Sequence, residues 1–117
     1  MSFLLGLAGF LLTIGIIVIV HEGGHFFTAK FFNIKVTRFS FGMGPVLWRR
    51  RKGETEYCFS ALPLGGYVRM ADEADADLTE DDRRRLYTRQ ARWKRGLVLF
   101  AGPATNFVLA FFLYVMV

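Results

Sequence analysis

Two long stretches without a charged residue, one at each end of the chain, constrain its fold more than any other feature. Phe3 to Val20 is a run of eighteen uncharged residues, and Leu97 to Val117 is a run of twenty-one. A helix of about 20 apolar residues crosses a hydrocarbon layer about 30 Å thick. We therefore expect a mainly α membrane protein with transmembrane helices in residues 1–32 and 96–117. The first run lacks a basic start and a small-residue cleavage site, so we interpret it as a span and not as a cleaved signal peptide.

The positive charges indicate how such a chain would be oriented. All fifteen Lys and Arg residues lie between Lys30 and Arg95, within a formal net charge of +5. Basic loops stay on the cytoplasmic side, so we expect residues 33–95 in the cytoplasm and the N-terminus outside. Membrane topology already accounts for the basic charge, and we expect no nucleic-acid partner. The single cysteine, Cys58, excludes an internal disulfide, as is usual in a reducing compartment.

The segment after the first run has the composition of a β-hairpin. Residues 33–71 are rich in β-branched and aromatic side chains and are interrupted by Gly and Pro. "VLWRRR" and "ETEYCFSAL" predict two strands joined near Lys52 and Gly53. "SFGMGP" and "PLGGYV" are typical of turns, which we expect to flank this hairpin. Its apolar residues indicate a hairpin associated with the membrane.

Residues 72–95 change from acidic to basic. "ADEADADLTEDD" predicts a solvated linker or a helix start, with Thr79 as the N-cap. "RRRLYTRQARWKR" predicts a basic helix or an interfacial segment, because Tyr87 and Trp93 are typical of membrane–water boundaries. We expect this segment to anchor the chain. In the second span, Pro103 predicts a kink or a distorted first turn.

The first apolar run ends in "HEGGH", which matches the pattern H-E-x-x-H. His21 and His25 are four residues apart and so share one helix face, where two imidazoles can bind one Zn²⁺. Glu22 lies beside them, where a carboxylate can move protons during peptide hydrolysis. Zinc lowers the pKa of a water molecule to about 7, which makes a nucleophile available at neutral pH. Ionisable residues within a membrane span are functional by default, which favours a metal site over a chance match.

Two features of this motif stay open at the level of sequence. Gly23 and Gly24 each cost a helix about 1 kcal/mol relative to Ala. They either leave room for a neighbouring helix or a substrate, or they reflect drift that a lipid environment tolerates. A zinc peptidase normally has three protein ligands, and the chain offers no evident third one.

Three signatures together resemble the site-2 proteases, which are intramembrane zinc metalloproteases. "VHEGGHFFTAKFFNIKVTRFSFGMGP" resembles the first helix of that family and the loop after it. "LWRRRKGETEYCFSALPLGGYVRM" resembles its membrane-associated β-hairpin, and "AGPATNFVLA" its second conserved span. The most similar branch is that of the regulator of sigma-E proteases, bacterial enzymes that cleave anti-sigma factors in the inner membrane.

The resemblance implies roles for particular residues. His21 and His25 would bind zinc, and Glu22 would be the general base and acid. Asn106, within the G-P-x-x-N match, would hold substrate or polarise a group near the site; the alternative is an interhelical hydrogen bond. The loops that present substrate would contain Phe41, Gly42, Met43 and Gly44, and Pro63, Leu64, Gly65, Gly66 and Tyr67. An extended substrate could add as a strand to the hairpin edge.

The resemblance also implies partners outside the sequence. The third ligand of the family is an aspartate on a later transmembrane helix, and PDZ domains usually follow the second span. We therefore expect an N-terminal catalytic portion that works with membrane lipid, a transmembrane protein substrate and the rest of the same protease, and that is inactive alone. The alternative is a non-catalytic membrane module that binds substrate and has an incomplete metal site. Glu22 favours the enzyme, because binding metal alone would not need it.

Overall fold

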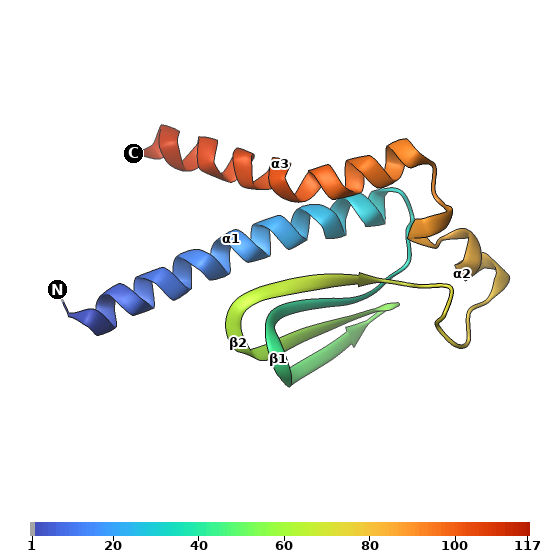
Figure 1. Ribbon diagram of the computed structural model, residues 1–117, viewed down its shortest axis with the longest axis horizontal. Helices are drawn as coiled ribbons and strands as arrows, with labels where there is room; N and C mark the ends of the chain where they lie inside the picture. Colours follow the sequence, from blue (N-terminus) through green and yellow to red (C-terminus); the bar gives the residue numbers. More distant parts are fainter. Residues whose placement is uncertain (1) are drawn as a thin grey trace.

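Two long helices lie side by side, and a bent β-hairpin packs against one of them (Figure 1). The computed structural model describes residues 2–117. Helix α1 (Phe3–Phe31) and helix α3 (Arg92–Met116) run in opposite directions, so that the start of α1 and the end of α3 lie at the same end of the molecule. In the view of Figure 1 the hairpin is on the opposite side of α1 from α3, and it meets α3 only near the end of α1. The three layers measure 57 × 33 × 20 Å along the principal axes.

Helix α1 begins and ends where the sequence predicts. The Ser2 hydroxyl caps its first turn by accepting a hydrogen bond from the Leu5 amide. Asn33 has a φ of 60°, the left-handed conformation that commonly follows a helix end, and its amide donates to the Lys30 carbonyl. Both α1 and α3 are long and apolar enough to cross a membrane. The predicted mainly α architecture with two such helices and a hairpin is therefore confirmed for the described residues.

The hairpin is longer than the sequence predicts. Strand β1 (Val36–Lys52) and strand β2 (Thr55–Met70) form an antiparallel pair. The expectation that "SFGMGP" and "PLGGYV" flank the hairpin as turns is wrong, because both segments lie inside the strands. They bend the strands instead, with positive φ at Gly42, Gly44 and Gly65.

Because both strands bend, the hairpin folds back on itself into four half-strands. Arg38 to Phe41 have Cα partners on both sides, in 66–69 and in 56–59. The order across the layer is therefore 66–70, 36–41, 55–60 and 46–52. The half-strand 66–70 lies nearest α1, and the half-strand 46–52 is the far edge (Figure 1).

The two faces of this sheet differ in chemistry. The Phe26 ring on α1 contacts Phe39 and Tyr57, so this face is aromatic and packs on the helix. Arg38, the residue next to Phe39, is paired across the strands with Glu56 and Arg69 and lies on the opposite, charged face. This alternation follows from the two-residue period of a strand.

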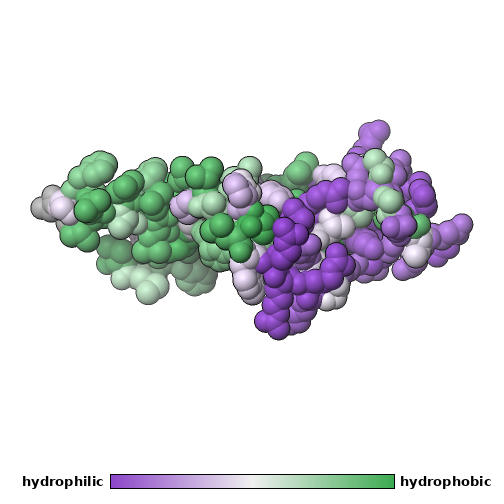
Figure 2. Space-filling model, turned by 90° about the horizontal axis from the view of Figure 1, so that it is seen from below, coloured by the Kyte–Doolittle hydropathy of each residue, from purple (hydrophilic) through white to green (hydrophobic). Residues whose placement is uncertain are grey.

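The core lies where α1, α3 and the sheet meet. Phe26 and Ala29 of α1, Ile34 and Val36 of the following segment, and Val98 of α3 are all buried there. Most other apolar side chains of the helices are exposed. Figure 2 shows apolar residues over one half of the long axis and hydrophilic residues over the other. A chain with this distribution fits a membrane protein.

The segment between the sheet and α3 is not one basic helix. Thr79 caps α2 (Glu80–Arg84) as predicted, in a capping box with Asp82. A 3₁₀ turn at Tyr87–Arg89 follows, and α3 begins at Arg92, earlier than the predicted span. Pro103 lies inside α3.

Candidate metal centre

The two histidines of the H-E-x-x-H motif lie together at the α1–α3 interface. His21 and His25 are one helical turn apart on the face of α1 that meets α3. Their Nε2 atoms are 3.2 Å apart, and the two rings meet edge to face with centroids 4.8 Å apart. The spacing in the sequence thus brings two ring nitrogens to one point.

The other nitrogen of each ring is held by α3. His25 Nδ1 is 2.7 Å from the carbonyl oxygen of Val98. A carbonyl only accepts, so Nδ1 carries the proton and Nε2 keeps its lone pair. His21 Nδ1 is 3.1 Å from the side-chain amide nitrogen of Asn106, and Asn106 Oδ1 is buried without a partner among residues 2–117. Rotating this amide by 180° brings Oδ1 to the Nδ1–H of His21 and gives the unpartnered oxygen a donor.

This arrangement fits a zinc ion. With both Nδ1 atoms protonated, two Nε2 lone pairs face each other, and a cation between them would remove their repulsion. Tetrahedral zinc with Zn–N distances of 2.0–2.1 Å holds two nitrogens about 3.3 Å apart, close to the observed 3.2 Å. Gly102 faces the same point, where a Cβ atom would lie 2.8 Å from His21 Nε2 and closer still to His25 Nε2. The missing side chain leaves space in front of both donors.

The histidine pair is not joined by a third ligand in the described part of the chain. No three His, Cys, Asp or Glu side chains converge anywhere within residues 2–117. Cys58, the only cysteine, is buried in the sheet, and its thiol donates to Glu56. Burial, together with this hydrogen bond, raises the pKa of the Cys58 thiol, which makes it a poor ligand.

Glu22 follows His21 in the sequence and lies next to the histidine pair on α1. It borders a cavity of about 190 Å³ that also reaches His25. The rest of the cavity wall is apolar and comes from three segments: Val68 and Met70 of β2, Tyr87 of the 3₁₀ turn, and Val98 and Leu99 of α3. Glu22 and His25 therefore border the same cavity as the half-strand of β2 nearest α1.

The two glycines of the motif have different surroundings. A Cβ atom on Gly24 would lie 2.5 Å from Thr105 Oγ1 and even closer to the carbonyl oxygen of Ala101. A Cβ atom on Gly23 would meet nothing within 4 Å. Gly24 is therefore required for the close approach of α3, where Thr105 Oγ1 lies 3.0 Å from the Val20 carbonyl oxygen. The sequence left two interpretations open for the two glycines, and the one in which a missing side chain leaves room for a neighbouring helix applies to Gly24.

The predicted substrate loops pack on α1 before the histidines. A Cβ atom added to Gly15 would lie 3.2 Å from the Phe41 ring, so this ring packs against the helix there. A Cβ atom added to Gly66 would lie 3.0 Å from the Val18 side chain. Both contacts lie about 4 to 9 Å along the helix axis from His21. The substrate roles of all nine loop residues stay predictions; they are Phe41, Gly42, Met43, Gly44, Pro63, Leu64, Gly65, Gly66 and Tyr67. Met43 and Leu64 are exposed at the bends, and the Tyr67 hydroxyl accepts from Arg38 on the charged face.

Several contributors to the site have no signature of their own in the sequence. The Val98 carbonyl acts through the backbone, which any residue carries. Val68, Met70 and Tyr87 reach the Glu22 cavity only because the hairpin folds back and the 3₁₀ turn follows it. Gly102 does have a signal, since a small residue in a span indicates a close helix contact.

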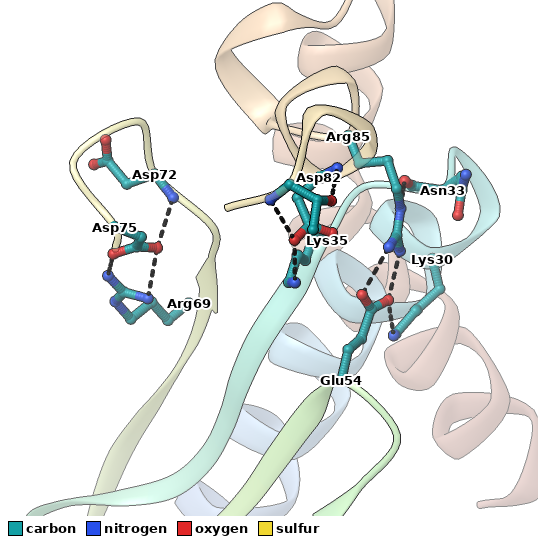
Figure 3. Close-up of polar contacts among 10 residues, drawn as sticks. Lys30, Asn33, Lys35, Glu54, Arg69, Asp72, Asp75, Asp82 and Arg85 are labelled. Atoms are coloured by element: carbon teal, nitrogen blue, oxygen red, sulfur yellow. Dashed lines mark hydrogen bonds and ion pairs between the residues drawn. The ribbon is translucent and has the colours of Figure 1, made fainter. Parts of the chain in front are cut away.

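A group of ion pairs holds the sheet and the linker to the end of α1 (Figure 3). Glu54, in the turn between β1 and β2, accepts from Lys30 of α1 and from two nitrogens of Arg85. Arg85 also donates to the Asn33 carbonyl. The Arg85 guanidinium lowers the pKa of the Glu54 carboxyl below its ordinary value, with Lys30 adding to the effect. We call Glu54, Lys30 and Arg85 the clasp.

Comparison with known proteins identifies the family. Residues 9–117 match the sequence profile of peptidase family M50. The chain belongs to this family. Regulator of sigma-E protease RseP of Escherichia coli is 41% identical over 118 residues, which cover 100% of this chain and 26% of that protein. The Haemophilus influenzae regulator of sigma E protease is 42% identical over 97% of this chain.

The similar proteins also give information on the metal and on the share of a longer protein that this chain covers. A Vibrio cholerae protein, provisionally named a zinc metalloprotease, is 41% identical over 92% of this chain and 24% of its own length. The name of the Vibrio cholerae protein agrees with the zinc fit of the histidine pair. The chain spans about a quarter of the length of the curated relatives it matches.

Proposed function

We propose that this chain is the N-terminal catalytic portion of an intramembrane zinc metalloprotease that cleaves transmembrane proteins such as anti-sigma factors. The observation that carries the proposal is the histidine pair. Two Nε2 atoms lie 3.2 Å apart with both Nδ1 atoms engaged by α3, beside a glutamate and within a helix apolar enough to cross a membrane. A chain that only bound partners would have no use for this set.

Each residue of the set has a chemical task. His21 and His25 would hold Zn²⁺ through Nε2, and Val98 and Asn106 fix the orientation and tautomer of the two rings. When bound, zinc lowers the pKa of water and polarises the substrate carbonyl. The Glu22 carboxylate would take a proton from the attacking water and give it to the leaving amine. Gly102 keeps the approach to the two Nε2 atoms open.

The sheet would present the substrate. The half-strand 66–70 has partners on one side only, in β1, and lies beside the Glu22 cavity. Its free backbone groups can pair with an extended substrate, which would bring a peptide bond past the carboxylate. A transmembrane substrate must unwind before its backbone can pair in this way, because helical backbone groups are already hydrogen-bonded to one another.

We place the histidine pair within the bilayer, below the cytoplasmic surface. In this proposal α1 and α3 span a bacterial inner membrane, residues 33–95 are cytoplasmic, and the N-terminus is outside. The proposal rests on the position of the basic residues, because all fifteen Lys and Arg lie between Lys30 and Arg95. By resemblance to the family, an aspartate on a later helix would complete the zinc ligands and PDZ domains would follow, so we expect residues 1–117 alone to be inactive.

The test distinguishes the role of the Glu22 carboxylate in catalysis from the role of the histidines in binding zinc. In the complete gene product, Glu22→Gln should abolish cleavage of a transmembrane substrate while zinc stays bound in the unchanged ligand set. His21→Ala should reduce the zinc content as well as the activity. Cleavage by the Glu22→Gln variant at the wild-type rate would remove the assigned base. A wild-type protein that binds the substrate without cleaving it would leave a binding module as the better account.

A further inference from the structure

The cavity beside Glu22 has the form of a side-chain pocket. Its volume is about 190 Å³, which corresponds to roughly six water molecules at about 30 Å³ each and to one large side chain. Apart from Glu22 and His25 its wall is made of apolar or aromatic groups. The site that we propose for proton transfer thus adjoins an apolar space that the proposed chemistry does not use.

The wall of this pocket is held in place before any substrate binds. Val98 is buried, and its carbonyl oxygen is bonded to His25. The Tyr87 hydroxyl donates to the Arg95 carbonyl over 3.3 Å, so its polar tip is engaged and its ring faces the pocket. Val68 and Met70 lie on a half-strand that is paired with Phe39 and Val36. A pocket with such walls selects by shape more than one that must form around its ligand.

We propose that this pocket receives an apolar side chain of the substrate, one residue position next to the cleaved bond. The inference rests on the proposed function and adds the substrate class. In a strand added along 66–70, alternate side chains point to the same face, so one of them meets Val68 and Met70 beside Glu22. A Leu, Met or Phe side chain fills the space.

The neighbouring carboxylate adds a second element of selection. An Asp or Glu side chain at this position would lose its water and meet the like charge of Glu22. An Ala side chain would leave most of the space unfilled. Each missing methylene in an apolar enzyme pocket costs about 10- to 200-fold in kcat/KM. We therefore expect cleavage to fall at least 10-fold from Leu to Ala and further from Leu to Asp.

The experiment compares substrates that differ at one residue, in the complete gene product. Val68→Phe fills the pocket and should lower the Leu-to-Ala ratio of kcat/KM at least 10-fold. Leu47→Phe is the matched control, because it adds an aromatic ring to an exposed residue at the far edge of the same sheet, and it should leave the ratio unchanged. If Val68→Phe changes kcat/KM by the same factor for all substrates, the proposed role of the pocket is wrong.

A binding measurement keeps the test valid if Val68→Phe does not fold. In a Glu22→Gln background, Met70→Cys should be cross-linked by a bismaleimide to a cysteine placed at the selected substrate position, and Leu47→Cys should not. Failure to cross-link at every substrate position next to the cleaved bond would contradict the pocket. If Glu22→Gln abolishes cleavage while substrate selection ignores Val68, the pocket inference is wrong and the proposed function stands. A wild-type protein that binds zinc and substrate but cleaves none of the substrates would count against the proposed function itself.

Discussion

Replacing Gly24 by Ala should weaken zinc binding without touching a ligand. The added Cβ atom would lie 2.5 Å from Thr105 Oγ1, whereas ordinary van der Waals contact begins at 3.4 Å. The Ala101 carbonyl is closer still, and as a backbone group it cannot rotate away. Helix α3 must therefore retreat by at least about 0.9 Å, and overpacking of this kind costs about 1–3 kcal/mol.

The retreat of α3 would reach both histidines. The Asn106 contact with His21 Nδ1 would lengthen from 3.1 Å to about 4 Å, and the Val98 contact with His25 Nδ1 from 2.7 Å to about 3.6 Å. Both distances lie beyond a hydrogen bond. Loss of an outer partner of a metal-binding histidine lowers metal affinity by about 10- to 100-fold, so Gly24→Ala should lower zinc affinity by at least 10-fold.

The adjacent glycine supplies the control for this prediction. Gly23→Ala makes the same chemical change on the same helix but meets nothing within 4 Å. It should leave zinc affinity unchanged and raise helix stability by up to about 1 kcal/mol. Zinc affinity is measured by competition with a chelator on the purified complete gene product. Equal affinities for the Gly24→Ala and Gly23→Ala variants would refute the argument that close helix packing holds the histidine pair.

Three further predictions concern the amide, the clasp and the topology. Asn106→Leu should lower zinc affinity by about 10- to 100-fold with little loss of thermal stability, as read by chelator competition and a melting curve; unchanged affinity would remove its assigned role at His21. Because the pKa of Glu54 is lowered in the folded protein, the clasp should stabilise the hairpin above the ordinary glutamate pKa of about 4.3 and weaken as the pH falls through the folded pKa. The hydrogen-exchange protection factor at the Gly53 turn should then fall at acid pH in the wild type and in a Glu73→Gln control, but depend little on pH in Glu54→Gln. A cysteine at Lys52 should react with an impermeant reagent only from the cytoplasmic side; labelling from outside would reverse the orientation.

Much of the architecture follows from local signals in the sequence. The uncharged runs predict both long helices, Asn33 and Thr79 mark the helix boundaries, and Lys52 and Gly53 mark the turn between the strands. These signals act over a few residues, which is why they are readable without the fold. The interval of four residues between His21 and His25 likewise predicts that they share a face of α1.

The features that the sequence does not predict depend on contacts between distant segments. Gly42 and Gly65 are typical of turns, yet strand pairing continues around them, and the hairpin becomes a layer of four half-strands. The position of Glu22 beside Met70 exists only because that layer packs on α1. The pairing of Asn106 with His21 joins residues 85 positions apart in the chain, and the sequence leaves its role open between substrate and helix contact.

The metal content of the complete gene product is the most direct measurement of the central claim. Purified in a mild detergent and analysed by X-ray absorption at the zinc edge, it should contain one zinc per chain with two imidazole ligands. The His21→Ala and His25→Ala variants should each lose most of this metal. A wild-type protein that is folded and active against a transmembrane substrate, yet free of zinc, would contradict the account.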